Sequence, residues 1–278
     1  MIGLEKGITK EAVRMAWPAV CESFFIALAG MVDSLMVSSM GASAVAAVGL
    51  TTQPKFMGLA LFFAMNVSVS ALVARRRGEK NQRSANQILL VAILFVIVAT
   101  VVISLACVMW ANEIINFCGS APETHEPAVI YYRIIMGCMI FNVLSMVINA
   151  AQRGSGNTMI AMRTNIVSNV VNIIANYLLI QGHLGFPALG IAGAAIATVF
   201  GTVIACIMSF ASLFRRDGFV SIYYIMEQQI RPALEPVISI IKLGFSVFIE
   251  QILMRVGFMS TAMMAAKMGT NALAAHQV

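Results

Sequence analysis

Seven long apolar runs dominate this sequence and restrict its fold more than any other feature. The predicted runs lie at residues 12–38, 45–74, 87–111, 127–151, 159–181, 188–214 and 237–266, and an eighth begins near Asn271. Each is long enough to cross a membrane as an α-helix, which takes about 20 apolar residues. The composition agrees, because 60% of the residues are hydrophobic and 11% are charged, against about 25% charged in a soluble domain. The sequence therefore predicts an all-α integral membrane protein.

An apolar unit near the start of the chain returns near its end. Trp17–Leu50 and Phe245–Val278 align without a gap. The identical pairs include Glu22/Glu250, Met40/Met268, Gly41/Gly269, Ala44/Ala272, Ala46/Ala274 and Ala47/Ala275. Because six predicted spans separate the two copies, both begin on the same side of the membrane. Such a parallel repeat is typical of transporters built from two bundles.

Lysine and arginine gather in alternate loops, and this pattern predicts the orientation of the chain. The basic loops contain Lys6, Lys10, Arg14, Arg75, Arg76, Arg77, Lys80, Arg83, Arg153, Arg163, Arg215, Arg216, Arg231 and Lys242. The opposite loops contain almost no basic residue, so the positive-inside rule predicts a cytoplasmic N-terminus in a multi-pass protein of the cell membrane. The net charge of +6 is explained by this concentration of Lys and Arg in cytoplasmic loops. The expected partner is the lipid bilayer, and no nucleic-acid partner is expected.

The longest loop divides the predicted spans. Residues 215–236 contain two prolines and mixed charges. We expect residues 1–214 to form a six-helix bundle, 215–236 to be a cytoplasmic inter-lobe loop, and 237–278 to start a second, incomplete lobe. This organisation corresponds to one complete bundle, a seventh helix and the start of an eighth.

Four ionisable residues stand out within the predicted spans. Glu22 and Asp33 lie in the first span, and Glu250 and Arg255 in the seventh. A charged side chain at the bilayer centre costs at least about 2.5 kcal/mol and usually faces a cavity or a partner. Eleven residues make about three helical turns, so Glu22 and Asp33 share one face about 16 Å apart. A buried carboxylate can bind and release H⁺ or Na⁺. The alternatives are a structural ion pair, such as an imperfectly faced one between Glu250 and Arg255, or a carboxyl group at the lipid boundary.

The fifth predicted span carries a polar stripe. It contains Asn165, Asn169, Asn172 and Asn176. The last three recur at spacings of three and four residues, so they share one face, which can line a cavity or join helices by hydrogen bonds. The depth of Asn176 matches that of Asp33 and favours a shared site. Thr198 lies within a face of small residues in the sixth span and offers a further oxygen.

At these residues the chain resembles the multidrug and toxic compound extrusion (MATE) family. The matching stretches are Pro18–Asp33 followed by MGASAVAAVGL, Ala74–Gly78, Gln152–Met162, Ser168–Ile180, Leu189–Thr198, and finally IEQILMR and GTNALAAHQV. The resemblance implies twelve helices in two lobes, of which this truncated chain carries the N-lobe and the start of the C-lobe. It also implies a secondary antiporter that exports cationic or amphipathic drugs and metabolites in exchange for H⁺ or Na⁺.

The resemblance further assigns residues to the coupling site. The family's cation site corresponds to Asp33, Asn172, Asn176 and Thr198, and its seventh-helix acid to Glu250. Glu22, Asn169 and Arg255 are secondary candidates that follow from the residues of the spans and not from the resemblance. Many bacterial relatives carry an aspartate in place of Asn176, and the family's GxP appears here as Gly244-Phe245-Ser246. The expected partners are cationic or amphipathic small molecules and the missing C-lobe, with no cofactor besides the coupling ion.

Other functions fit the residues less well. A lipid-linked sugar flippase would place cationic residues in its cavity, whereas nearly all Lys and Arg here fall in loops. A seven-helix receptor has its N-terminus outside. The five cysteines are scattered singly, no histidines have metal-ligand spacing, and neither a P-loop nor a catalytic constellation is present, so we expect no metal site and no enzyme. A non-functional truncated fragment is a further alternative.

Overall fold

The computed structural model describes the backbone of residues 2–268 and the side chains from residue 16 onward. Its elements are α1 (Ile2–Ser38), α2 (Ala42–Gly78), α3 (Gln82–Met109), α4 (Ala111–Phe117), α5 (Pro122–Gly137), α6 (Met139–Gly154), α7 (Thr158–Leu179), the 3₁₀ turn η1 (His183–Gly185), α8 (Gly190–Leu213), α9 (Ile222–Glu227) and α10 (Leu234–Lys267). The all-helical prediction is confirmed. The start of an eighth span, predicted near Asn271, lies outside the described residues.

The seven predicted spans correspond to α1, α2, α3, the α5–α6 pair, α7, α8 and α10. Within the described part, α1, α2, α3, α8 and α10 are each long and apolar enough to cross a membrane, and α5 with α6 makes a sixth such unit. Helix α7 has 22 residues, but its four asparagines make it less apolar than those helices. The short helices α4 and α9, in the connections, were not predicted.

The fourth span is broken, which corrects the prediction of one continuous helix over 127–151. Its two halves, α5 and α6, meet at Cys138 with a bend of 47°. The Ser104 hydroxyl of α3 donates a hydrogen bond of 2.7 Å to the carbonyl oxygen of Met136. A side chain that inserts into the backbone ladder is a recognised cause of a kink. Ser104 thus supplies a polar partner where the helix loses its own.

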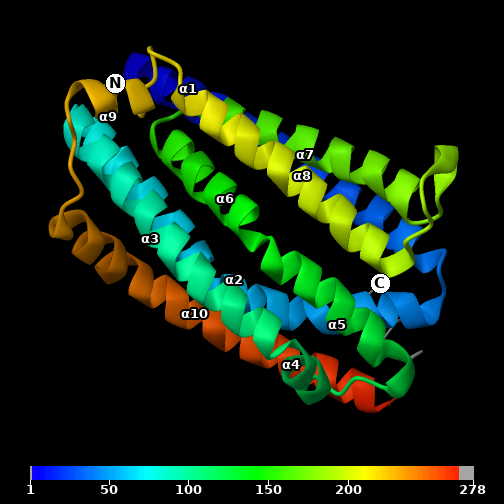
Figure 1. The fold of residues 1–278 in the computed structure, drawn as a ribbon. Helices are drawn as coiled ribbons and strands as arrows, with labels where there is room; N and C mark the ends of the chain where they lie inside the picture. Colours follow the sequence, from blue (N-terminus) through cyan, green and yellow to red (C-terminus); the bar gives the residue numbers. More distant parts are fainter. Residues whose placement is uncertain (1, 269–278) are drawn as a thin grey trace.

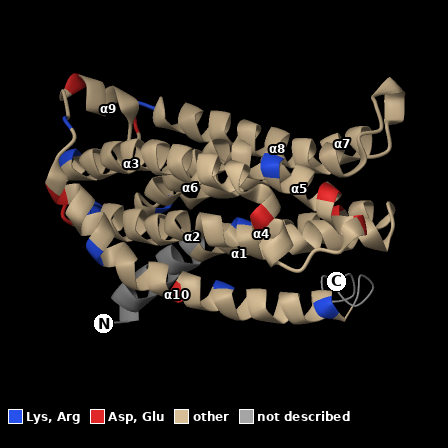
Figure 2. Cartoon of the chain, turned by 60° about the horizontal axis from the view of Figure 1, so that its bottom comes forward, with Lys and Arg blue, Asp and Glu red and all other residues tan. Residues whose placement is uncertain are grey.

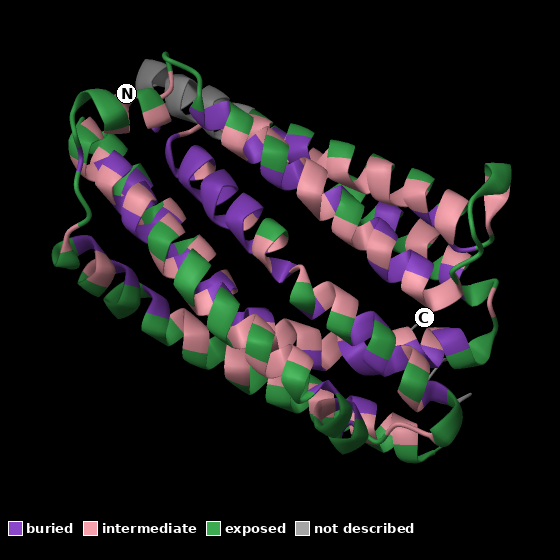
Figure 3. Ribbon diagram, in the orientation of Figure 1, coloured by how far each residue is buried: buried purple, intermediate pink, exposed green. Residues whose placement is uncertain are grey.

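Figure 1 shows how the helices are arranged. Helices α1, α7 and α8 lie side by side, α2, α3 and α10 form the opposite side, and α5–α6 runs between them. Figure 3 shows that α6 is the most thoroughly buried helix. The largest fully buried side chains of this core include Phe62, Leu89, Tyr132, Met136 and Ile148. The bent span is therefore the centre of the bundle.

Most basic residues lie at one end of the bundle, whereas acidic residues occur at both. The α2–α3 and α6–α7 turns and the α8–α10 connection, which hold most of the basic residues, lie at one end (Figures 1 and 2). The acidic residues of α4 and α5 lie at the other. At the basic end Glu79 accepts hydrogen bonds from Arg76 (2.8 Å) and Arg75 (3.0 Å), and these bonds lower the pKa of the Glu79 carboxyl. This separation agrees with the loop pattern of the sequence.

The two helices related by the repeat, α1 and α10, are the least covered spans. Only 11% of the residues in their apolar stretches are buried, against 44% in α2. The exposed apolar side chains include Trp17, Phe24 and Met31 on α1 and Phe245, Leu253 and Phe258 on α10. Both helices therefore present an apolar face that no part of the described chain covers.

Candidate functional site

The centre of the candidate site is a contact between α1 and α7. The Asn176 side-chain amide donates a hydrogen bond to Oδ1 of Asp33. Asn176 is fully buried and Asp33 is half-buried. The amide oxygen of Asn176 is also buried and accepts no hydrogen bond within the described chain. The two side chains, which the sequence predicted to lie at the same depth, are therefore in direct contact.

A second polar contact joins α7 to α8 beside this pair. Asn172 donates a 3.3 Å hydrogen bond to the Thr198 hydroxyl, which donates in turn to the carbonyl oxygen of Ala194 at 3.0 Å. The Tyr131 side chain of α5 is buried beside Thr198 and Asp33. Asp33, Asn172, Asn176 and Thr198 thus form a polar layer contributed by α1, α7 and α8.

Two glycines of α8 allow this close approach. A Cβ atom on Gly193 would lie 2.4 Å from the backbone oxygen of Leu179, and one on Gly201 would lie 2.8 Å from that of Ser168. Real Cβ atoms do not come so near, so any larger residue would push α7 and α8 apart. The face of small residues seen in the sixth span is therefore a packing face, and it holds Thr198 within reach of Asn172.

One charged residue near Asp33 was missed by sequence reasoning. Lys55, on α2, is half-buried and interacts electrostatically with the Asp33 carboxylate. The signal was present, because Lys55 directly follows Pro54 inside the apolar run 45–74. We refer to Asp33, Lys55, Asn172, Asn176 and Thr198 as the Asp33 site.

The Asp33 site offers a defined chemistry. Its carboxylate can take a proton, and its carboxylate, amide and hydroxyl oxygens are the ligands that hard cations bind. A carboxylate among apolar spans is costly, and here the amide N–H of Asn176 offsets part of that cost. A proton or a small cation could replace part of that stabilisation, so the site is suited to reversible binding of either.

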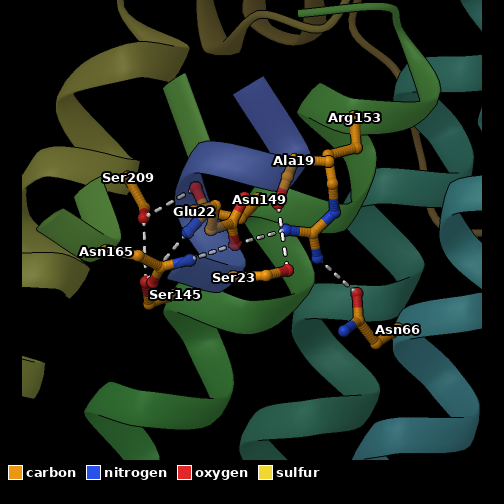
Figure 4. Close-up of polar contacts among 9 residues, drawn as sticks. All are labelled: Ala19, Glu22, Ser23, Asn66, Ser145, Asn149, Arg153, Asn165 and Ser209. Carbon is orange, nitrogen blue, oxygen red and sulfur yellow. Dashed lines mark hydrogen bonds and ion pairs between the residues drawn. The ribbon is translucent and has the colours of Figure 1, made fainter. Parts of the chain in front are cut away.

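Glu22 lies in a second cluster, shown in Figure 4. It accepts a hydrogen bond from Asn165 of α7, and its Oε1 lies 3.6 Å from Nη1 of Arg153 on α6. Arg153 also donates to Asn66 of α2 at 3.0 Å. We refer to Glu22, Asn66, Arg153 and Asn165 as the Glu22 cluster. It ties four helices together, as the structural interpretation of a membrane carboxylate expects.

A separate buried hydrogen-bond network joins α6 to α8 beside this cluster (Figure 4). Ser145 and Ser209 share a bond of 2.9 Å, and Asn149 donates to Ser145 at 3.3 Å and accepts from Ser209 at 3.1 Å. The sequence signal was the spacing of four residues between Ser145 and Asn149, which places both on one helical face. These bonds join only hydroxyl and amide groups. The network is therefore interpreted as a structural contact between α6 and α8, and not as a site that binds a proton or a cation.

The remaining predicted residues lie elsewhere. Asn169 is half-buried on α7 and makes no side-chain hydrogen bond within the described chain. Glu250 is exposed on α10, and the described structure contains no ion pair between it and Arg255. The Arg255 guanidinium instead lies 4.4 Å from the centre of the Phe56 ring. The structure therefore brings neither Glu250 nor Arg255 into hydrogen-bond contact with Asp33.

The model of the MatE family matches residues 18–178, a range that includes Asp33 and Asn176. The chain is 26% identical over 273 residues to the probable multidrug resistance protein NorM of Thermotoga maritima. This alignment covers 98% of this chain and 58% of that protein.

Two solved transporter structures are similar to this chain in fold. A MOP superfamily transporter from Pyrococcus furiosus matches with a TM-score of 0.83 and 26% identity, over 95% of this chain and 57% of its own. An inward-facing multidrug resistance MATE family transporter matches with a TM-score of 0.80 and 26% identity, over 90% and 56%. The chain thus spans between 56% and 58% of the length of these three proteins.

Proposed function

The chain belongs to the MatE family, and on this premise we propose that it forms the first half of a secondary antiporter. In this proposal residues 1–214 are the N-lobe bundle, 215–236 the cytoplasmic inter-lobe loop, and 237–278 the start of the C-lobe. The uncovered apolar faces of α1 and α10 support it, because a second bundle needs such a surface to move against the first.

The proposed transport exports cationic or amphipathic small molecules in exchange for H⁺ or Na⁺. The observation that carries it is the half-buried Asp33 carboxylate held by the buried Asn176 amide between α1 and α7. When Asp33 binds the coupling ion, the negative charge that accepts the hydrogen bond of Asn176 is neutralised. The contact between α1 and the rest of the bundle then weakens, which gives ion binding a mechanical effect on the lobe.

The proposed orientation places the N-terminus in the cytoplasm of a cell whose plasma membrane holds the protein. The concentration of basic residues at one end of the bundle supports this orientation, since cytoplasmic loops are enriched in Lys and Arg. In this orientation the Asp33 site lies in the outer half of the membrane, and the Glu22 cluster lies in the inner half.

Dye efflux tests the proposal. The gene is expressed from its natural reading frame in a drug-sensitive host that lacks its own exporters, and efflux of a cationic dye is followed after an imposed H⁺ or Na⁺ gradient. We expect gradient-driven efflux in the wild type and its loss in Asp33→Asn at equal membrane levels. The same change at exposed Asp217 in the loop should preserve efflux. Wild-type efflux by Asp33→Asn would refute the proposed role of this carboxylate.

A further inference from the structure

The chain between α8 and α10 is attached to the first turns of α3. Asn86, fully buried on α3, donates a hydrogen bond of 2.9 Å to the carbonyl oxygen of Phe219 and accepts one of 2.9 Å from the backbone N–H of Ser221. The same amide nitrogen also donates to the carbonyl oxygen of Gln82, in its own helix, at 2.9 Å. One buried side chain therefore binds the backbone of the loop through both its donor and its acceptor.

Two more side chains of α3 extend this attachment in both directions along the loop. At the first residue of α3, the amide nitrogen of Gln82 lies 3.5 Å from the carbonyl oxygen of Gly218. Gln87 donates a hydrogen bond of 3.1 Å to the carbonyl oxygen of Arg231. The segment between Gly218 and Arg231 is thus held at both ends, and we refer to residues 218–231 as the strap.

Apolar side chains of the strap are part of the bundle core. Val220 is fully buried and belongs to the same cluster as Leu89 and Leu213. Partly buried apolar side chains beside it pack on that cluster, namely Phe219, Ile222 and Ile225. The short helix α9 within the strap lies against the start of α3 (Figure 1). Since a flexible linker is typically polar and rich in glycine and serine, this packing indicates a fixed element.

The strap is also closed at its C-terminal end. Gln229 adopts a left-handed φ of 46°, and the N–H of Ile230 donates to the carbonyl oxygen of Ile225 at 3.0 Å. This bond is typical of the Schellman motif, which ends a helix and brings two apolar side chains together. Ile230 is buried, and only Pro232 and Ala233 separate the strap from α10. A change in the direction of α10 relative to the strap must therefore occur at this short connection.

We propose that the strap stays attached to α3 throughout transport, with Asn86 as its positioning residue, and that the second lobe pivots on Pro232 and Ala233. Hinges are a few loop or helix-terminal residues that absorb a change of backbone angles between packed elements. Here the packed elements are the strap and α10. The inference rests on the proposed transport function, and it makes the strap a mechanical part of the first bundle.

Two covalent links in the protein expressed from its natural reading frame test where the chain bends. The first joins Gln87→Cys to Arg231→Cys through a short bis-maleimide, at positions where side chain and backbone are 3.1 Å apart. The second is a disulfide between Ser68→Cys and Gly244→Cys. A Cβ atom on Gly244 would lie 2.9 Å from Oγ of Ser68, so this disulfide joins α2 to α10. Mass spectrometry measures the yield of each link, and the single-cysteine variants are the controls.

The two links have opposite expected effects on gradient-driven dye efflux. The link between residues 87 and 231 should leave efflux within about twofold, because the strap does not need to leave α3, whereas the disulfide should abolish efflux until a reductant is added, because it fixes α10 to the first bundle. Loss of efflux with the first link overturns the proposal, and unchanged efflux with the second overturns the pivot. Absence of efflux in the unlinked protein refutes the antiporter instead, and hydrogen exchange then tests the strap by itself.

Hydrogen exchange of the purified protein tests the role of Asn86. We expect Asn86→Ala to speed amide exchange in residues 219–230 about tenfold, the effect of losing a buried hydrogen bond, and to leave α7 and α8 unchanged. Asn116→Ala, at an exposed position of α4 at the other end of the bundle, is the control.

The same variant should lower the maximal rate of efflux without changing the dye concentration that gives half of that rate. Adding the link between residues 87 and 231 to Asn86→Ala should restore both slow exchange and efflux, which general damage to the fold would not allow. Exchange of the strap at the wild-type rate in Asn86→Ala overturns the role of Asn86, as does a failure of the link to restore efflux.

Discussion

Asp33 of α1 and Asn176 of α7 form one of two polar contacts between these helices in which the partners are the same number of residues apart in the sequence. Asn176 donates to Asp33 and Asn165 donates to Glu22, each across 143 positions. The two acids are eleven residues apart, and so are the two asparagines. The helices therefore run parallel and in register, with one polar contact near their C-terminal ends and one closer to the basic end of the bundle.

The Asn176 amide should stabilise the fold as well as the site. Asn176→Leu removes the hydrogen bond that Asp33 accepts and leaves a half-buried charge with fewer partners, so we expect a loss of about 1–3 kcal/mol in the free energy of unfolding. SDS unfolding titrations of the purified chain measure it. Asn169→Leu, on the same helix and without a side-chain hydrogen bond in the described chain, is the control and should change stability much less. Equal losses in both variants would contradict the special role of Asn176.

Gly193 should tolerate no side chain. Gly193→Ala places a Cβ atom against the backbone oxygen of Leu179, and overpacking of this kind costs about 1–3 kcal/mol. The matched change Gly257→Ala, on α10, meets no atom within 4 Å and should be neutral or stabilise the helix by up to about 1 kcal/mol. The same SDS titration compares the two. A neutral Gly193→Ala would show that α7 and α8 approach each other less closely.

Ser104 should hold the bend between α5 and α6. Ser104→Ala removes the hydroxyl that donates to Met136, and we expect a loss of about 1 kcal/mol in the unfolding titration. Ser260→Ala serves as the control, since this hydroxyl is exposed and donates only to its own helix, at 2.9 Å to Val256. An equal effect in the two variants would mean that the break does not depend on α3.

Labelling of introduced cysteines tests the orientation. A membrane-impermeant maleimide added to intact cells should modify Glu123→Cys in the first turn of α5 and spare Arg83→Cys in the first turn of α3. Background from the native Cys118 should be low, because this thiol is buried and its burial raises its pKa to about 11, which leaves little reactive thiolate at neutral pH. Modification of Arg83→Cys alone would invert the proposed topology.

The features that the sequence predicts well are those that the membrane imposes. The spans follow from apolar length, and the contact of Asp33 with Asn176 was expected because helical periodicity and depth are both legible in the sequence. Lys55 was overlooked although a lysine inside the apolar run 45–74 is a visible signal, because no second polar residue at helical spacing pointed to a site there. The break at Cys138 was missed for a different reason, since its polar partner, Ser104, belongs to another helix.

Glu250 and Arg255 form no ion pair in the described structure, although the sequence analysis considered an imperfectly faced one. Five residues along one helix separate these side chains by more than a quarter turn, and the guanidinium lies over Phe56 of α2 instead. Packing between α2 and α10 therefore decides the orientation of Arg255, and a single-helix pattern contains no information about that packing. The roles assigned to the site residues remain predictions.

The bend at Cys138 divides one span into two parts with different surroundings. The α5 half brings Tyr131 to the layer of Asp33 and Thr198. The α6 half carries Ser145, Asn149 and Arg153, which form hydrogen bonds with α8 and α2 and an ion pair with Glu22 of α1. Because the helix is interrupted at Cys138, we expect a displacement in the layer of Asp33 to change the bend angle between α5 and α6 more than it moves α6, whose side chains are bonded to three other helices.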